Sequence, residues 1–323
     1  EVCARSIAAA GGEPGHFLHN AYGYGLFTGG LGLHFGAEAL GVGVIPAGGG
    51  QSLRQIRLLE DLKPQGISCT PSYALTLVDV MEKEGVDPRG LGTRYGIFGA
   101  EPWSEAMRRA IEEAWGLKAV DIYGLSEIIG PGVGCECVEA QAGPHINEDH
   151  FLVEVVDPET GELLGEGEVG ELVFTTLTKE AMPLLRYRTG DLAAVEPPGC
   201  ACGRTFRRIS RIKGRTDDMI ILRGVNVFPS EVERVILSFS ELAPHYRLVL
   251  RREDRLDELE VQVEATPRVW DPKVPPLGLQ QKIAHRLHED LGVRLAVVVL
   301  PPGSLPRSEG KALRVVDARE EKG

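Results

Sequence analysis

Three short motifs combine aromatic, hydroxyl, carboxylate and guanidinium side chains. Residues 123–127 read Tyr-Gly-Leu-Ser-Glu, residues 187–191 read Tyr-Arg-Thr-Gly-Asp, and residues 214–218 read Gly-Arg-Thr-Asp-Asp. A hydroxyl can contact a phosphate, a carboxylate can bind a divalent cation or the hydroxyls of a ribose, and a guanidinium pairs with an anion. Taken singly, each motif is also typical of a capped helix or a surface ion pair. Their combination favours a nucleotide site.

A lysine near the C-terminus offers a further charge. Lys311 lies in the sequence Pro-Arg-Ser-Glu-Gly-Lys-Ala, which has neither helical nor strand periodicity and is therefore expected to form an exposed loop. An ammonium group on such a loop can stabilise the negative charge that develops on a phosphate in a transition state. The alternative is a solvated lysine in the tail.

Four of the six cysteines form two closely spaced pairs, at 135 and 137 and at 200 and 202. With His145 they supply five soft ligands, and four such ligands suffice for a tetrahedral Zn²⁺. We predict Cys137, His145, Cys200 and Cys202 as the possible zinc ligands, with Cys135 as an alternate. The Cys-Xaa-Cys spacing is tighter than in common zinc motifs, so free thiols in a reducing compartment are the competing interpretation.

The elements that must position these motifs follow from the alternation of helical and apolar patterns up to residue 122. Helices are predicted to end at Gly41, to cover 52–62 with Ser52 as the N-cap, to run from after Pro71 to Gly85, and to run from a cap at Ser104 to Trp115. Strands are predicted over 42–46, 66–70, 94–98 and 118–122. This alternation is typical of βαβ units that build a mostly parallel sheet. Ligands bind beyond the carboxyl ends of such strands, so we expect 99–102 and 123–127 to lie side by side.

The pattern then changes twice. Residues 151–212 alternate short strands, with a turn at 157–161, which predicts a β-rich subdomain. Strands are then predicted over 219–222, 246–251, 258–264 and 295–299, and helices over 230–238 and 278–291. The predicted fold class is α/β, with a large N-terminal domain (1–216) of βαβ units and a β-rich subdomain, and a small mobile C-terminal α+β domain (217–323). The chain opens inside a helix-like segment, so we expect an N-terminally truncated large domain.

In this order and company, the motifs resemble the adenylate-forming superfamily and, within it, the phenylacetate-coenzyme A ligases. The resemblance extends over essentially all 323 residues and is most specific over 16–32, 174–191 and 214–229. It implies an ATP-dependent acid-thiol ligase that converts phenylacetate or a related aryl carboxylic acid to an acyl-AMP and transfers the acyl group to coenzyme A, with Mg²⁺ as a cofactor. The Ser, Thr and Gly-rich phosphate loop of the family is missing, which leaves open whether the chain turns over by itself.

The resemblance also implies roles for individual residues. Lys311 and Glu127 are implied as catalytic, with Glu127 as the Mg²⁺ ligand. ATP or AMP binding is implied for Gly99, Ala100, Glu101, Pro102, Asp121, Ile122, Tyr123, Gly124, Ser126, Asp191 and Arg215. Among these, the ring of Tyr123 would pack on adenine, Ser126 would touch the α-phosphate, and Asp191 with Arg215 would contact the ribose.

Further roles implied by the resemblance concern domain motion and the other two substrates. Asp217 corresponds to the hinge, and Arg223 with Gly224 to the loop that contacts coenzyme A. The acyl pocket is assigned to Tyr22, Tyr24, Phe27 and Gly124. Glycines between aromatic residues leave room for a flat acyl group. A glycine-rich helix packed closely on a sheet is the competing interpretation of 20–32.

Composition narrows the function classes. The net charge of −12 argues against a nucleic-acid surface, although the basic segment 204–215 either faces a polyanionic cofactor or forms a solvated face. No apolar run approaches the roughly 18 residues that a membrane helix needs, so we expect a cytoplasmic monomer or homodimer without membrane contact. Two alternatives stay open: an adenylating enzyme with a different acceptor, and an inactive remnant that binds nucleotide or zinc.

Overall fold

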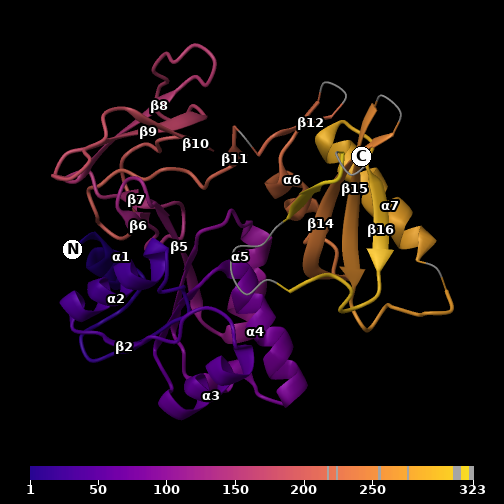
Figure 1. Ribbon diagram of the computed structural model, residues 1–323, viewed down its shortest axis with the longest axis horizontal. Coiled ribbons are helices and arrows are strands. Elements are labelled where there is room, and N and C mark those ends of the chain that lie inside the picture. The colour runs from indigo at the N-terminus through magenta and orange to yellow at the C-terminus, as the bar shows by residue number, and fades with distance from the viewer. Residues whose placement is uncertain (217, 223–224, 254–255, 275, 308–313, 320–323) are drawn as a thin grey trace. The chain divides into compact units, whose positions relative to one another are not determined.

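The computed structural model describes residues 1–216, 218–222, 225–253, 256–274, 276–307 and 314–319. They form two compact units (Figure 1). One comprises Glu1–Pro102 and Arg108–Thr216, and the other comprises Trp103–Met107 together with the described residues from 218 onward. The assignment of 1–216 and 217–323 as functional domains stays a prediction. Within the described ranges, no helix combines the length and the apolar character needed to cross a membrane.

The first unit is built on a seven-stranded sheet in the order β2-β1-β3-β4-β5-β6-β7. The first five strands along the chain run parallel, whereas β6 and β7 are antiparallel. The strands are β1 (Phe17–Asn20), β2 (Gly43–Ile45), β3 (Gly66–Cys69), β4 (Tyr95–Gly99), β5 (Lys118–Leu125), β6 (Gly130–Cys135) and β7 (His145–Ile146). The predicted βαβ architecture is therefore confirmed, and the antiparallel edge extends it.

Local sequence signals mark the ends of some helices of this unit. The predicted cap at Ser52 is wrong, because the helix over 52–62 follows Gln51, whose side chain makes no capping hydrogen bond. The helices are α1 (Val2–Ala9), α2 (Thr28–Leu40), α3 (Ser52–Leu62), α4 (Pro71–Glu84) and α5 (Glu105–Trp115), with a 3-10 turn η1 (Pro88–Leu91). For α4, the Thr70 side chain accepts a hydrogen bond from the Tyr73 amide, Pro71 occupies the first turn, and Gly85 closes the helix with a φ of 74°. Each of these residues stabilises the conformation that it occupies.

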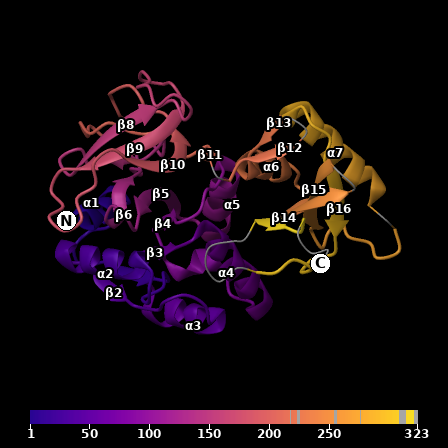
Figure 2. The ribbon, with the colours of Figure 1, turned by 45° about the horizontal axis from the view of Figure 1, so that its top comes forward.

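A second, antiparallel sheet in the same unit has the order β11-β10-β9-β8. Its strands are β8 (Phe151–Val156), β9 (Gly170–Thr176), β10 (Tyr187–Ala193) and β11 (Gly214–Arg215). Phe151 and Phe174 share a buried cluster with Tyr123 and Ile146, so the two sheets pack through one core. Figure 2 shows β8, β9 and β10 beside β5 and β6. The predicted turn at 157–161 is present, because the Asp157 carboxylate accepts the Glu159 and Thr160 amides at 2.9 and 2.8 Å.

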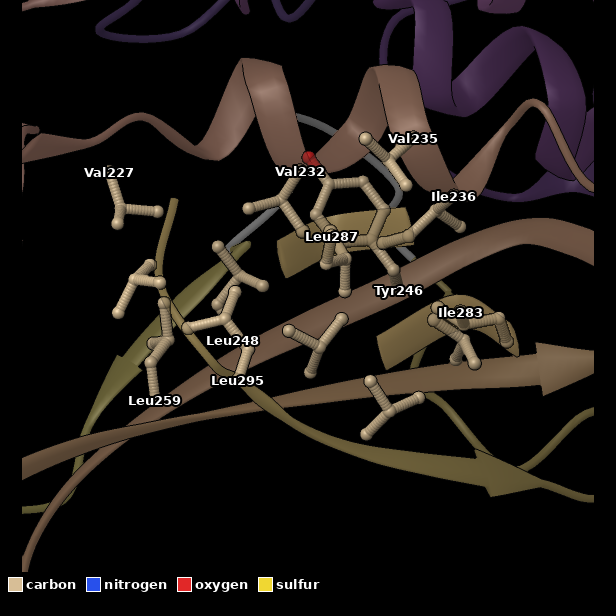
Figure 3. Packing of buried hydrophobic residues seen from close by; sticks show 14 of the residues in the cluster. Val227, Val232, Val235, Ile236, Tyr246, Leu248, Leu259, Ile283, Leu287 and Leu295 are labelled. Atoms are coloured by element: carbon tan, nitrogen blue, oxygen red, sulfur yellow. The ribbon is translucent and has the colours of Figure 1, made fainter. Parts of the chain in front are cut away.

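The second unit is the predicted small α+β arrangement. Its four-stranded sheet has the order β16-β15-β14-β17, and a separate two-stranded antiparallel sheet pairs β12 with β13. The elements are β12 (Ile220–Leu222), β13 (Val225–Val227), α6 (Pro229–Ile236), β14 (Leu242–Glu253), β15 (Leu256–Ala265), α7 (Leu277–Leu291), β16 (Ala296–Leu300) and β17 (Val315–Asp317). Figure 3 shows Val232, Ile236 and Leu287 packed over Leu248 and Leu259 of the sheet. The short strands β13 and β17 were not predicted.

Candidate functional site

The three motifs meet at the carboxylate of Asp191. The Tyr123 hydroxyl, at the end of β5, donates a hydrogen bond to Oδ2 of Asp191 at 2.7 Å. Arg215 donates from Nη1 to Oδ1 at 3.0 Å, and the antiparallel pairing of β10 with β11 sets Arg215 directly opposite Asp191. Residues from three distant parts of the sequence therefore form one hydrogen-bonded group.

Burial strengthens the electrostatic interactions within this group, because little water screens them. Asp191 and Tyr123 are 7% and 8% exposed, and the Tyr123 ring stacks on Phe174 with a centroid distance of 6.0 Å. Burial first, and then the negative charge of Asp191, hold the pKa of Tyr123 well above its usual value. The phenol consequently remains a donor to the carboxylate, and little of its ring is left exposed to stack on a ligand.

The backbone around Asp191 is shaped by an irregularity in β10. The pairing with β9 shifts register between Arg188 and Leu192, and Gly190 has a φ of 78°. A Cβ atom at Gly190 would lie 3.1 Å from the Arg215 guanidinium. Glu171, which is 4% exposed, accepts the Gly190 amide at 3.0 Å and the Arg188 Nε at 2.8 Å. Glu171 was not predicted as a site residue, because a buried acid has no distinct signal in the sequence.

Ser126 and Glu127 follow β5 and are exposed. The Ser126 hydroxyl lies 3.3 Å from the hydroxyl of Thr28 at the start of α2, and the Lys179 ammonium donates to the main-chain carbonyl of Glu127 at 2.6 Å. Burial raises the pKa of Tyr187, and the charges of Glu127 and Asp191 raise it further.

The loop 99–102 lies beside the end of β5, as predicted from the strand order. Gly99 pairs with Ile122, and a Cβ atom at Gly99 would lie only 2.3 Å from the Ile122 carbonyl oxygen. Ala100 adopts a left-handed φ of 68°. The Glu101 carboxylate accepts the Ser72 amide at 2.7 Å at the N-terminal end of α4, where the helix dipole favours a negative charge.

The aromatic residues assigned to an acyl pocket are only partly grouped. The rings of Tyr22 and Phe27 lie 6.1 Å apart, whereas Tyr24 makes an edge contact with His34 at 5.7 Å. The Tyr22 hydroxyl donates to the Cys69 carbonyl at 2.7 Å, so this side chain is fixed. A Cβ atom at Gly124 would lie 2.0 Å from the Gly130 carbonyl oxygen, so this position accepts only glycine.

The structure groups the four predicted zinc ligands. Their ligand atoms all lie within 4.8 Å of one another. The Cys137 and Cys200 sulfurs are 3.7 Å apart, and the Cys202 sulfur is 3.4 Å from Nε2 of His145. Cys135 is not part of this group, because its sulfur points to the Ser6 carbonyl at 3.7 Å.

The chemistry of this cluster fits Zn²⁺. Zinc bonds of about 2.3 Å to sulfur and 2.0 to 2.1 Å to nitrogen place tetrahedral ligands roughly 3.6 to 3.8 Å apart. Nδ1 of His145 lies 2.9 Å from the Phe206 carbonyl, a partner that leaves Nε2 as the metal-binding nitrogen. Burial opposes ionisation of Cys202, but hydrogen bonds from Arg204 and the neighbouring thiols outweigh it and lower the pKa of Cys202 to about 7.

Four of the predicted site residues, Lys311, Asp217, Arg223 and Gly224, lie outside the residues that the structure describes. Asp121 and Ile122 lie on β5, with Ile122 buried. The described site therefore consists of the ends of β4 and β5, the irregular strand β10, and β11.

Comparisons with known proteins agree with this geometry. Residues 27–177 match the model of the AMP-binding enzymes, and residues 224–319 match that of the AMP-binding enzyme C-terminal domain. A crystal structure of 2-hydroxyisobutyryl-CoA ligase in the postadenylation state, in complex with R3-HIB-AMP, superposes with a TM-score of 0.93 at 32% identity, covering 98% of this chain and 69% of that one. Fold and site thus define an adenylate-forming enzyme.

Two curated relatives narrow the assignment. Phenylacetate-coenzyme A ligase of Thermus thermophilus is 56% identical and covers 99% of this chain and 75% of that protein. The enzyme of the same name from Escherichia coli is 50% identical and covers 98% of this chain and 72% of that protein. The chain belongs to the phenylacetate-coenzyme A ligase family, and the resemblance seen in its motifs is confirmed.

Proposed function

We propose that the chain is an ATP-dependent acid-thiol ligase that activates phenylacetate or a related aryl acid as an acyl-AMP and transfers the acyl group to coenzyme A. The observation that carries this proposal is the convergence of Tyr123, Asp191 and Arg215 in a chain of this family. The buried, doubly hydrogen-bonded carboxylate is fixed in place before a nucleotide arrives. It is suited to accept hydroxyl groups of a ribose without reorganisation.

In the first step, a carboxylate oxygen of the acid attacks the α-phosphorus of ATP, and pyrophosphate leaves. Ser126 and Glu127, both exposed at the end of β5, are the proposed contacts to the phosphate and to Mg²⁺, respectively. Bound Mg²⁺ would neutralise phosphate charge. Lys311 is the proposed cation that stabilises the negative charge growing on the reacting phosphate.

In the second step, the thiol of coenzyme A attacks the acyl carbonyl and AMP leaves. Asp217 is the proposed hinge for the conformational change between the steps, and Arg223 and Gly224 are the proposed contacts to coenzyme A. A neighbour supports such a change. The 2-hydroxyisobutyryl-CoA ligase that matches at 0.93 in its postadenylation state matches at 0.66 in its thioesterification state with CoA, so that ligase adopts different conformations in the two states.

The aryl acid is proposed to bind beside Tyr22, Tyr24, Phe27 and Gly124. Phe27, which is 43% exposed, offers flat apolar surface beside the buried ring of Tyr22. The close backbone approach at Gly124 excludes any side chain at that position. Preference for aryl over short alkyl acids is the expected consequence. The reaction needs only soluble substrates, and the buried free thiols suit a reducing compartment, so we place the enzyme in the cytoplasm.

A structural Zn²⁺ is the second part of the proposal. Cys137, His145, Cys200 and Cys202 would hold it and would join the segment after β6 to the loop at 200–202. Metal analysis of the purified chain tests this assignment. We expect about one zinc per chain in the parent and in Cys135→Ser, and much less in Cys202→Ser. Equal zinc content in both variants would contradict the ligand set.

The activity is tested by incubating the chain with ATP, Mg²⁺, coenzyme A and a panel of aryl and alkyl acids. Pyrophosphate, AMP and thioester are then measured separately. Equal amounts of all three with phenylacetate support the proposal. Pyrophosphate without thioester would indicate a different acceptor. ATP binding detected by calorimetry without any pyrophosphate would indicate a nucleotide-binding protein that does not turn over, and would contradict the ligase assignment.

A further inference from the structure

A buried ion pair contacts β5 just before the proposed nucleotide loop and has no role in the mechanism above. Glu136 is 0% exposed and Arg108, on α5, is 2% exposed. Nη2 of Arg108 donates to Oε2 of Glu136 at 2.5 Å. A carboxylate removed from water costs several kcal/mol unless charged and hydrogen-bonding partners replace the water. The hydrogen-bonding partners of Glu136 therefore show which segments its buried carboxylate connects.

Two of these partners are main-chain amides. The Asp121 amide on β5 donates to Oε2 of Glu136 at 2.8 Å, and the Gly143 amide donates to Oε1 at 3.0 Å. The Glu136 amide in turn donates to the Asp121 carbonyl at 2.8 Å. Asp121 is thus bound to Glu136 by both its amide and its carbonyl group, two residues before Tyr123. Arg108 adds a further contact to β5, because its Nη1 donates to the Ala119 carbonyl.

The position of this contact matters because the ladder between β5 and β6 is irregular just beyond it. Ile122 pairs with Cys135 and Tyr123 with Gly134, but the register then shifts, and Gly124 pairs with Pro131. Regular ladder hydrogen bonds therefore do not carry the alignment from Tyr123 into the loop. The Glu136 carboxylate holds β5 at Asp121, immediately before the register shift and the loop at 123–127.

The same carboxylate also reaches the segment that carries two proposed zinc ligands. Cys137 follows Glu136 in the chain, and Gly143 lies two residues before His145. Gly143 has a φ of 97°, and a Cβ atom there would lie 2.0 Å from the Ile209 carbonyl oxygen. This backbone conformation accepts only glycine and turns the Gly143 amide toward the carboxylate. Glu136 is therefore one link between the cysteine-rich segment and β5, together with Gln141, whose Nε2 donates to the Ala119 carbonyl at 2.9 Å.

We propose that Glu136, supported by Arg108, is a positioning residue for the nucleotide-binding loop 123–127, acting through the Asp121 amide. The proposal rests on the proposed function for the role of that loop. Glu136 itself contacts no substrate in this role. The consequence is that removing the acceptor oxygen loosens β5 near its carboxyl end and weakens nucleotide binding, while the rest of the sheet keeps its order.

A pair of double variants tests this role. Removing only one member of the pair leaves an uncompensated buried charge and threatens folding. Glu136 has a second cationic partner, because Nε of Arg211 lies 3.8 Å from its Oε1. Arg108→Met/Glu136→Met and Arg108→Met/Glu136→Gln both remove the charges of the Arg108–Glu136 pair, conserve much of the volume, and leave Arg211 equally without this carboxylate. Only the glutamine variant keeps an acceptor oxygen for the Asp121 amide. The two variants therefore differ at the hydrogen bond in question.

Two readouts are measured on each folded variant: amide hydrogen exchange of peptides covering 121–127 without ligand, and the Kd of AMP. In the double methionine variant we expect both the exchange rate and the Kd to rise about tenfold, and the glutamine variant to recover most of the loss. Equal values in the two variants, or an even rise in exchange over α1 and β1 as well, would overturn the positioning role. A parent chain that binds no AMP contradicts the proposed function, whereas the exchange data still judge Glu136.

Discussion

Replacing Asp191 by asparagine removes the charge at the point where the three motifs meet and keeps the side-chain shape. The carboxylate accepts hydrogen bonds from the Tyr123 hydroxyl and the Arg215 guanidinium at 2.7 and 3.0 Å. An asparagine has only one acceptor oxygen, so its amide group must face one of these two donors. Asp191→Asn therefore loses one hydrogen bond and weakens the other.

The cost can be worked out for stability and for binding. A hydrogen bond to a charged group contributes about 1.5 to 3 kcal/mol. The Arg215 side chain is 31% exposed, and solvent screening reduces its share, so we expect the free energy of unfolding to fall by about 2 kcal/mol. For binding, loss of the charged acceptor for the ribose weakens the binding free energy of AMP by about 1.5 to 3 kcal/mol, which corresponds to about a 10- to 150-fold rise in Kd.

The assay is calorimetric titration with AMP, together with urea unfolding. Tyr123→Phe is the matched control, because it removes a donor to Asp191 and leaves the charge. We expect it to lower the free energy of unfolding by about 1 kcal/mol and to raise the Kd less than tenfold. If Asp191→Asn binds AMP as tightly as the parent, or if both variants weaken binding equally, Asp191 is not the ribose acceptor and the reasoning fails.

Three further predictions concern other parts of the chain. Burial lowers the pKa of His19 to about 4, despite its hydrogen bond to Gln55, so between pH 6.5 and 4 this side chain is neutral in the folded state but protonated in the unfolded chain. The free energy of unfolding should therefore fall by up to about 3 kcal/mol as the pH drops from about 6.5 to 4. Urea titrations of His19→Gln should lack this pH dependence. In the metal-free protein, alkylation of Cys202 should be half-maximal near pH 7, whereas Cys3, whose pKa burial raises to about 11, should stay unlabelled at that pH. Mass spectrometry of labelled peptides measures this, and labelling of Cys3 before Cys202 would contradict the prediction. Lys311→Ala should slow pyrophosphate release by about 100-fold or more and leave thioester formation from supplied acyl-AMP unchanged; equal losses in both half-reactions would assign Lys311 another role.

The sequence predicted the elements whose signals are local. The helix over 52–62 was found from its apolar periodicity, and the helix that ends at Gly85 from its terminal proline and glycine, because both kinds of signal act within a few positions. The strands β13 and β17 were missed, since each spans three residues and owes its existence to a partner strand, in the case of β17 the distant β14. Short strands carry too few residues to show a period.

For the candidate site, the sequence predicted which residues take part but not how they contact one another. The motif residues were predicted from their types and order, but the pairing of Asp191 with Tyr123 and Arg215 depends on the register of β10 with β11 and on the packing of the two sheets of the first unit. Glu136 and Glu171 had no signal, because an acid that will be buried looks identical in sequence to a surface acid. The exclusion of Cys135 from the zinc group likewise depends on where β6 directs its side chains.

The central claim, that the acid is activated as a mixed anhydride with AMP, is tested most directly by isotope transfer. The chain is given phenylacetate labelled with ¹⁸O in its carboxylate, together with ATP, Mg²⁺ and coenzyme A, and the AMP formed is examined by mass spectrometry. Attack of the carboxylate on the α-phosphorus, followed by cleavage of the acyl carbon to oxygen bond, predicts one ¹⁸O atom in each AMP. Unlabelled AMP, or ADP and phosphate as products, would contradict the account.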